Sequence, residues 1–410
     1  MANDTPVTET APLWESLEAF ARTKIQQFIQ SLLEEEVTEL LGRRRSERRA
    51  AVDAPAGYRN GHGKQRRLSM QGGTITLRRP RVRGLEGRFE SKILPLFARR
   101  TAEVGKMLPA PYLHGLALGD FELALRGLLG DGAPLSPASV ARLKASWEAE
   151  FAEWKARRLD DRELVYAWAD GVYVRAGLEK DRACLLVVIG AMRDGRKELL
   201  ACSSGQREST ESWSQVLRDL RDRGLNAPVM LVGDGALGLW AALANVWPTV
   251  RVGRCWNHRI LNVLDKLPRR LQRQATILLR EMAASGSRAE AERLRGKFAE
   301  RFSAFPDALA CLEKDGDALT AFFDFPKEHG KHLRTSNVVE SPFASLRLRT
   351  NAAKRFKVTT NATVLIWKVL RVAESRWRRL DAPELLKDVY DGRRFADGKP
   401  ITRSSERNAA

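Results

Sequence analysis

The chain is poor in cysteine, and that scarcity excludes one class of small, cross-linked protein. Four cysteines in 410 residues are too few for a disulfide framework, and such usage predicts a reducing cytosol. Long apolar runs are lacking as well, since the longest, around 183–192, is too short to span a bilayer. The N-terminus (1–10) is polar and acidic and shows no signal peptide. We therefore expect a cytoplasmic protein with no membrane partner.

The sequence also lacks two signals of nucleotide or single-strand binding. It contains no glycine-rich phosphate loop of the Walker type, so ATP is not implied. Aromatic residues are sparse in the basic segment 43–83, which argues against stacking on single-stranded nucleic acid.

What the chain has in excess is positive charge. Its 70 Lys and Arg residues outnumber 51 Asp and Glu residues, which gives a net charge of +19 and a pI near 10.2. Such a charge favours a polyanionic partner. A cationic membrane-surface protein is the alternative, but we find no cationic amphipathic helix with an aromatic face. We therefore expect double-stranded DNA as partner and a nucleoid-associated location.

The basic charge is densest near the N-terminus. A helix is predicted over 14–41 from its three- and four-residue apolar spacing, and it is typical of a packing or dimerising helix. The segment 43–83 then holds thirteen Lys or Arg residues against two acids, with a short alternating strand at 74–78. It is either a solvated linker or an arm that contacts DNA phosphates.

Two further helices are predicted on either side of a glycine turn, over 120–129 and 136–154. Ser136 and Pro137 suit the N-cap and first position of the second helix. The pair is compatible with a helix-turn-helix, and an ordinary helical hairpin is the alternative.

From residue 164 the pattern changes to short apolar runs typical of strands. We expect three antiparallel strands, then alternating helices and parallel strands: 164–175, 183–192, 197–202, 209–224, 229–232, 237–246 and 250–254. This is the ribonuclease-H-like order of an α/β fold, and right-handed crossovers would make the first and fourth strands neighbours. The stretch 258–327 is helical almost throughout, which indicates an all-α insertion before the core resumes.

Three acidic residues lie at positions that suggest a functional role. Asp170 lies within an apolar strand, Asp234 follows the strand 229–232, and Glu340 opens a helix. Two strand carboxylates and one helix carboxylate can converge on a pair of divalent cations. Each has a purely structural alternative: an Asp-Gly turn for both aspartates, the N-cap of the next helix for Asp234, and a capping-box glutamate for Glu340 if Asn337 is the N-cap.

A second pattern of interest is Cys255-Trp-Asn-His258, which has half of a zinc-ligand spacing. His329 and His332 could supply the other half, but the linear signal is weak.

Several strings together resemble the mutator-type insertion-sequence transposases of bacteria, which belong to the DDE class. The resemblance runs from about residue 40 to 390. It is carried by Gly57-Tyr-Arg-Asn-Gly61, Pro80-Arg-Val-Arg83, Asp170-Gly-Val-Tyr-Val-Arg, Ser209-Thr-Glu-Ser-Trp213, Arg223-Gly-Leu225, Asp234-Gly-Ala-Leu-Gly-Leu-Trp-Ala, Trp247-Pro248, Cys255-Trp-Asn-His258, Thr335-Ser-Asn-Val-Val-Glu-Ser and Arg347-Leu-Arg-Thr350. One departure is Leu261, where the family commonly has Arg before the residue that is Asn262 here.

The resemblance implies that Asp170, Asp234 and Glu340 form a catalytic triad that binds Mg²⁺, with Mn²⁺ able to substitute. It implies cutting and joining at the terminal inverted repeats of a mobile element, and Cys255 and His258 would form a supporting motif. A homodimer would pair two DNA ends. The residues we expect to contact DNA are Arg59, Asn60, Arg81, Arg83, Arg347 and Arg349.

The expected domain organisation follows from these segments. The boundaries are an N-terminal helix with a basic DNA-contacting segment (1–105), a helical region (106–160), a ribonuclease-H-like core in two parts (161–262 and 331–390), an all-α insertion (263–330) and a disordered tail (391–410). Two other functions stay open: a ribonuclease-H-like nuclease that cuts without joining, and a non-catalytic DNA-binding regulator derived from a transposase.

Overall fold

The structure is a computed structural model that describes residues 14–49, 51, 56–114, 116, 118–130, 137–175, 182–205, 207–353, 356 and 358–401. The chain forms two compact units, 1–143 and 144–410. They are described separately below.

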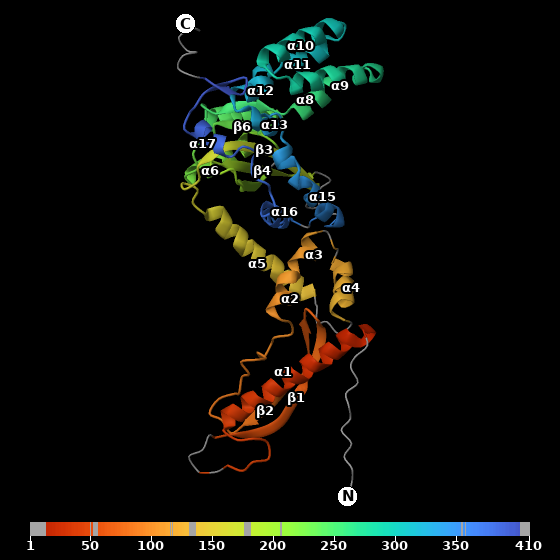
Figure 1. Cartoon of the computed structure of the whole chain (residues 1–410), viewed down its shortest axis with the longest axis vertical. Coiled ribbons are helices and arrows are strands. Elements are labelled where there is room, and N and C mark those ends of the chain that lie inside the picture. The colour runs from red at the N-terminus through yellow and green to blue at the C-terminus, as the bar shows by residue number, and fades with distance from the viewer. Residues whose placement is uncertain are drawn as a thin grey trace. The chain divides into compact units, whose positions relative to one another are not determined.

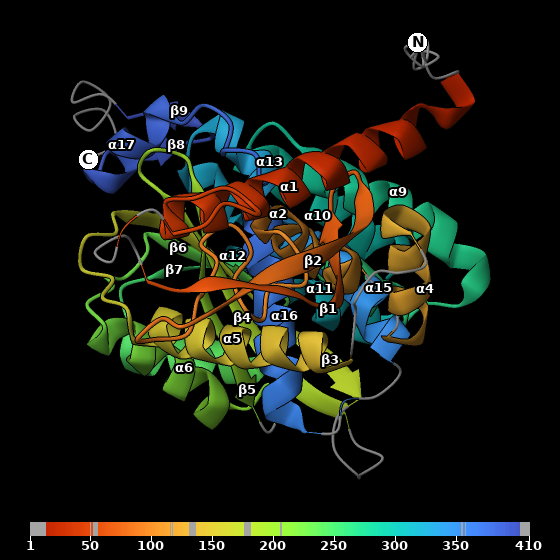
Figure 2. The same cartoon turned by 90° about the horizontal axis from the view of Figure 1, so that it is seen from below.

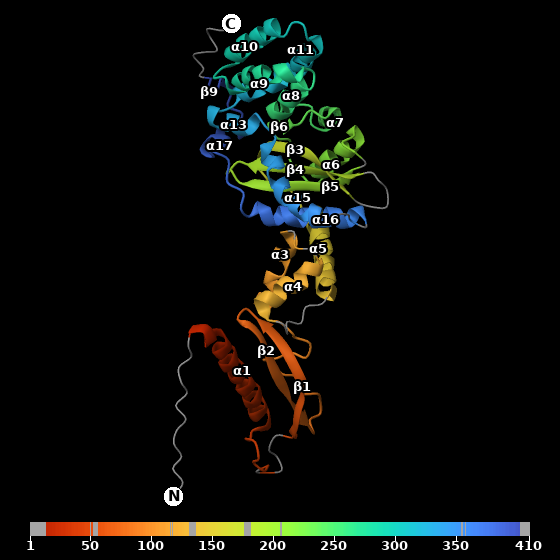
Figure 3. The ribbon, with the colours of Figure 1, turned by 90° about the vertical axis from the view of Figure 1, so that its right-hand side faces the viewer.

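The first unit is built on a long helix and a long β-hairpin. After a short 3₁₀ turn, η1 (Trp14–Ser16), α1 (Leu17–Leu41) packs along β2 (Gly73–Arg83), which pairs antiparallel with β1 (Tyr58–Met70) (Figures 2 and 3). Leu33, Val37 and Leu41 recur every four residues and are buried, since that spacing keeps them on one helix face. Of these, Leu33 joins one apolar cluster with Leu68 of β1 and with Ile75 and Leu77 of β2.

The hairpin decides between the two interpretations of the basic segment. The strand predicted at 74–78 lies inside β2, and its partner β1 was not predicted. Leu68 pairs with Ile75, and Arg66 with Leu77, so residues 58–83 form an ordered hairpin. The linker interpretation is therefore wrong for residues 58–83, because the two strands pair with each other.

Three short helices complete the first unit: α2 (Ala102–Met107), α3 (Pro109–Leu113) and α4 (Leu118–Leu129). The next helix, α5 (Pro137–Ala156), begins where the sequence places it. The predicted turn and N-cap between α4 and α5, including Ser136, lie outside the described residues. The helix-turn-helix therefore stays a prediction.

The second unit has a five-stranded mixed sheet at its centre. Its strands are β3 (Leu164–Arg175), β4 (Arg182–Met192), β5 (Lys197–Gly205), β6 (Met230–Gly233) and β7 (Arg251–Arg254), in the spatial order β5-β4-β3-β6-β7. The first three pair antiparallel, whereas β6 and β7 run parallel to β3. The predicted α/β class and strand order are confirmed.

Helices cover both faces of this sheet. The helices α6 (Thr210–Asp222) and α7 (Leu237–Val246) lie on one face, and Trp213, Leu217 and Leu243 join its main apolar core. The opposite side carries α13 (Gly330–Leu333) and α17 (Glu384–Tyr390) (Figure 3). There the Trp168 indole nitrogen donates to the carbonyl of His332 at 2.9 Å. The sheet is buried on both sides, as its continuous apolar strands require.

The segment after β7 is helical, as predicted. It contains α8 (Trp256–Leu264), α9 (Arg269–Ala284), α10 (Arg288–Arg301), α11 (Pro306–Glu313), α12 (Gly316–Thr320), η2 (Ala321–Asp324) and η3 (Lys327–His329). The helices α8 to α11 gather at one end of the unit (Figure 1). The chain returns to the sheet through α14 (Asn337–Glu340), α15 (Pro342–Ala353) and α16 (Thr359–Glu374), and α16 packs on β5.

The prediction of a disordered tail from Asp391 is wrong for residues 391–401. These residues form a small hairpin of β8 (Phe395–Ala396) and β9 (Lys399–Pro400). The hairpin is anchored because the Gly398 amide donates to the Phe323 carbonyl at 3.1 Å. Residues 402–410 lie outside the described part. No helix in the described part is long and apolar enough to cross a membrane.

The α6 face of the sheet should carry much of the stability of the second unit. Leu217 is fully buried in the core, whereas Leu237, at the start of the neighbouring helix, is 68% exposed. We expect Leu217→Ala to lower the free energy of unfolding by about 2–5 kcal/mol, and Leu237→Ala to change it by less than about 1 kcal/mol. Urea unfolding followed by tryptophan fluorescence measures both. Equal effects of the two changes would contradict this packing.

Candidate active site

The candidate site starts from the pairing of two parallel strands. Ala169 on β3 is in register with Gly233, the last residue of β6, and an aspartate follows each of them: Asp170 within β3 and Asp234 directly after β6. The two carboxylates therefore lie side by side at one edge of the sheet. Asp170 is only 9% exposed, and its Oδ1 accepts from the Gly171 amide at 2.8 Å.

The sequence allowed a turn at both Asp-Gly pairs, and the structure shows a different conformation at each. Gly171 pairs with Leu186 inside β3, so the turn interpretation is wrong for Asp170. At Asp234 the chain does turn: Gly235 has a φ of +90°, and Asp234 Oδ1 accepts from the Ala236 amide at 2.9 Å. This turn fixes the Asp234 carboxylate without removing it from the strand edge.

A third acid joins these aspartates, and we did not predict it. Oxygens of Asp170, Glu208 and Asp234 all lie within 4.8 Å of one another. Glu208 directly precedes Ser209, the N-cap of α6, whose hydroxyl accepts from the Ser212 amide at 3.2 Å. In the sequence Glu208 is one polar residue in a polar loop. Only the folding of β5 and α6 onto the sheet brings it to the aspartates.

Burial and like charge dominate the electrostatics of this group. Burial, followed by the charge of Asp234, raises the pKa of Asp170 to about 7. Burial also raises the pKa of Glu208, again with Asp234 as the next cause. Clustered carboxylate oxygens are the donors that Mg²⁺ and Mn²⁺ prefer, and a cation would relieve the repulsion among them. The three residues thus fit a divalent cation.

The third predicted acid, Glu340, is held differently. It ends the one-turn helix α14, whose N-cap is Ser336, so the capping-box arrangement with Asn337 as N-cap is wrong. Its Oε1 accepts from the Ser336 hydroxyl and lies 3.7 Å from Nδ1 of His258. Ligand atoms of Cys255, His258 and Glu340 lie within 4.8 Å of one another. Glu340 is thus grouped with this pair, and its charge still helps to raise the pKa of Asp170.

Cys255 and His258 form a coupled pair beside Glu340. The hydrogen bond with Cys255 raises the pKa of His258 to about 9 against the effect of burial, and the charges of Glu340 and Asp234 contribute. The Ser336 amide donates to Cys255 Sγ at 3.3 Å, which ties α14 to the start of α8. Both members of the pair thus lie against α14 and its N-cap, Cys255 beside Ser336 and His258 beside Glu340.

The two other histidines do not complete a zinc site. His329 Nδ1 contacts the Tyr166 hydroxyl at 3.0 Å, and its Nε2 contacts the Ala382 carbonyl at 3.1 Å. Both ring nitrogens are thus engaged in the core. His332 lies beside Asp381, with Nε2 3.6 Å from Oδ1. Neither histidine belongs to the group of metal-ligand atoms around Cys255 and His258.

The arginines expected to contact DNA fall into two sets. Arg81 and Arg83 on β2 are exposed, and Arg347 on α15 is exposed too. Arg59 instead donates to Glu34 Oε2 at 2.9 Å and to the Thr38 hydroxyl at 2.6 Å, so it fastens β1 to α1.

Asn60 is half-buried, and Arg349 is only 4% exposed. In this conformation the Arg349 guanidinium is not presented to a DNA backbone, because burial removes it from the surface. Its placement on the same helix as Arg347 does not give it the same exposure, since the two residues are two positions apart on α15 and face different sides.

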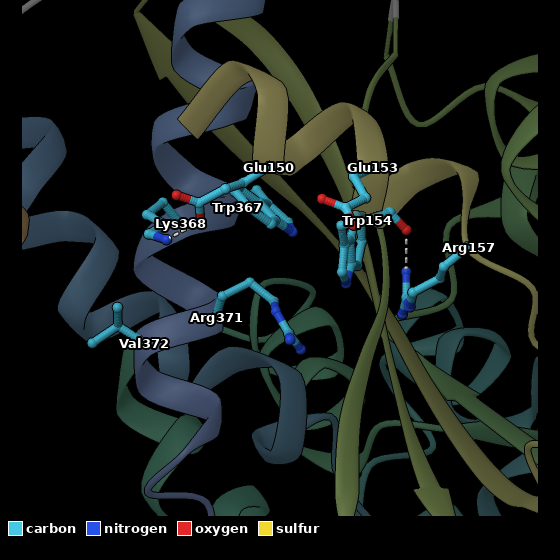
Figure 4. Close-up of a pocket in the computed structure, with 8 residues that line it drawn as sticks. All are labelled: Glu150, Glu153, Trp154, Arg157, Trp367, Lys368, Arg371 and Val372. Atoms are coloured by element: carbon cyan, nitrogen blue, oxygen red, sulfur yellow. Dashed lines mark hydrogen bonds and ion pairs between the residues drawn. The ribbon is translucent and has the colours of Figure 1, made fainter. Parts of the chain in front are cut away.

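A separate cavity of about 470 Å³ lies between α5 and α16 (Figure 4). Its floor is aromatic, with the rings of Trp154 and Trp367 5.7 Å apart. Its cations are all paired: Lys368 with Glu150, Arg371 with Glu374, and Arg157 with Glu198 at 3.3 Å. This cavity therefore offers no unpaired cation to a phosphate, and it lies within the second unit, where the last turns of α5 face α16.

Comparisons with known proteins agree on one family. The model of the family described as Transposase, Mutator family matches residues 5–380. The chain is 40% identical over 304 residues to the transposase for insertion sequence element IS6120 of Mycolicibacterium smegmatis, covering 74% of this chain and 94% of that protein. It is 42% identical over 280 residues to the transposase for IST2 of Acidithiobacillus ferrooxidans, covering 68% and 95%. A third relative, the transposase for ISRM5 of Rhizobium meliloti, is 26% identical over 382 residues and is covered to 93%.

The raised pKa of Asp170 predicts that the free energy of unfolding depends on pH. Asp170 binds its proton more tightly in the folded state than in the unfolded state. The stability that this proton contributes is fully present below pH 3.8, the ordinary pKa, and is lost as the pH rises through about 7. Without divalent cations, Asp170→Asn should therefore stabilise the protein by about 2–3 kcal/mol more at pH 8 than at pH 5. Urea unfolding in a chelator measures this. The exposed control Asp265→Asn should show no such pH dependence, and a flat difference for Asp170→Asn would contradict the burial argument.

Proposed function

The chain belongs to the Mutator family of transposases, and on that premise we propose that it is an insertion-sequence transposase that binds terminal inverted repeats and cuts and joins DNA with divalent cations. The observation that carries the proposal is the juxtaposition of Asp170 and Asp234 by the registered pairing of β3 and β6. The five-stranded order, with a helical segment between the second and third acids, supports a ribonuclease-H-like core.

The proposed chemistry assigns a role to each part of the site. Asp170 and Asp234 would hold the cations together with Glu340, and Mg²⁺ is the ion we expect, with Mn²⁺ as substitute. When bound, such cations stabilise charge on the scissile phosphate and lower the pKa of an attacking water or 3′-hydroxyl. His258 would orient Glu340 through the contact at 3.7 Å. Arg347, exposed on α15 beyond Glu340, would hold a neighbouring phosphate.

The first unit would supply most of the affinity for DNA. Its hairpin carries Arg81 and Arg83 on the exposed part of β2, where contacts to phosphates add salt-dependent affinity. A homodimer that pairs two DNA ends is part of the proposal. In support, η1 and α1 expose large apolar side chains besides the buried stripe of α1, among them Trp14 on η1 and Phe28 on α1, at 86% and 62%.

Two other functions differ from this proposal in their products. A nuclease that does not join would release nicked DNA only, whereas a transposase gives joined strands as well. A non-catalytic regulator would bind ends without nicking. The presence of Asp170 and Asp234 at one strand edge favours a catalyst over a regulator.

The central test is Asp234→Asn. We expect it to abolish nicking and joining of labelled inverted-repeat DNA in Mg²⁺, while binding of the same DNA stays within about twofold, because the carboxylate contacts the cations and not the bases. Asp265→Asn, an exposed change of the same charge, should retain full activity. If Asp234→Asn nicks DNA as well as the wild type does, this residue is not part of the site. If the wild-type protein gives nicks without joined products, the nuclease is favoured over the transposase.

The two kinds of arginine in the first unit should respond differently. Arg81→Ala should weaken DNA binding and reduce the slope of log K against log salt by about one, with no change in unfolding. Arg59→Ala should instead lower the thermal midpoint, since it removes the contacts with Glu34 and Thr38. Fluorescence anisotropy over a salt series and thermal unfolding measure both. Identical behaviour of the two variants would contradict this division.

A further inference from the structure

We propose that Glu208 is a cation-binding carboxylate of the same site, alongside Asp170 and Asp234. This inference rests on the proposed function, because it adds a residue to the catalytic site named there. It begins from the distances: oxygens of Asp170, Glu208 and Asp234 lie within 4.8 Å of one another, and Glu340 meets the same limit with Cys255 and His258.

Two glycines make the space that Glu208 occupies. A Cβ at Gly171 would lie 2.5 Å from both Cδ and Oε1 of Glu208. Gly171 lies inside β3 opposite Leu186 and is not in a turn, so its lack of a side chain is explained by the Glu208 carboxylate. A Cβ at Gly238 on α7 would collide with the Glu208 carbonyl oxygen. One glycine thus follows Asp170, the other lies shortly after Asp234, and both admit the same residue.

The neighbouring residues hold the Glu208 carboxylate beside Gly171 and the two aspartates. The loop before α6 is fixed by the Ser209 cap, and the Glu208 carboxylate interacts with the Tyr173 hydroxyl, two residues beyond Gly171 on β3. A tight cap next to a strand contact leaves the carboxylate little freedom to turn to solvent. Three acids held this close, one of them Asp170 at 9% exposed, repel one another unless a cation lies between them.

A purely structural role is the alternative, because an acid before a helix N-terminus also interacts favourably with the helix dipole. Glu208→Gln separates the two. The amide keeps the size of the side chain and can still accept from Tyr173, but it removes the charge that a cation would need. The matched control is Glu211→Gln, three residues later in the first turn of α6, where the side chain is exposed.

The readout is binding of Mn²⁺ to the full-length protein without DNA, measured by electron paramagnetic resonance of the free ion. We expect Glu208→Gln to weaken binding by at least about tenfold, a loss of the order seen when partners around a metal site are removed. Glu211→Gln should bind as wild type does. Thermal unfolding checks that each variant is folded.

Asp170→Asn distinguishes the failure of this inference from that of the proposed function. If Asp170→Asn loses Mn²⁺ binding and Glu208→Gln keeps the wild-type affinity, the inference on Glu208 is wrong and the proposed site stands. If Asp170→Asn also keeps it, the proposed cation site itself is wrong. Should Glu208→Gln fail to fold, Gly171→Ala displaces the carboxylate by steric contact. Wild-type Mn²⁺ affinity of a folded Gly171→Ala protein would contradict the inference as well.

Discussion

The parallel pairing of β3 with β6 is the constraint on which the rest of the second unit depends. Because Ala169 and Gly233 are in register, two carboxylates must emerge next to each other at one edge of the sheet. That placement opposes folding, since burial and mutual repulsion raise the pKa of Asp170 to about 7. The apolar core between the sheet, α6 and α7 supplies the stability that holds the two acids there. Charge repulsion at the site therefore destabilises the folded state, and the apolar core offsets it.

The surrounding elements bring further polar groups to this edge from distant parts of the sequence. The loop before α6 contributes Glu208, and α14 contributes Glu340 after the helical segment has ended. Cys255 and His258, at the start of α8, join that helical segment to α14 through Ser336 and Glu340. The start of the long helical segment after β7 thus contacts α14, the element that follows its end.

Much of this arrangement could be predicted from the sequence, and the exceptions have physical reasons. The apolar runs and the Ser209 cap predicted the strands of the sheet and the helices that pack on it. The apolar runs before Asp170 and Asp234 predicted that both acids lie on or next to strands. Glu208 was missed because a glutamate in a polar loop has no local pattern. The strand β1 was missed because most of its residues are polar or glycine and only Leu68 and Ser69 are buried, so the sequence shows no apolar alternation there. The exposure of Arg347 and the burial of Arg349 depend on how α15 packs, which spacing alone does not give.

The most direct test of the central claim is to locate the cation itself. Crystals of the protein with a DNA end and Mn²⁺ would give an anomalous difference map in which each Mn²⁺ appears as a peak. The account predicts a peak in contact with carboxylate oxygens of both Asp170 and Asp234. Peaks confined to other parts of the molecule, for example at Cys255 and His258 alone, would contradict it.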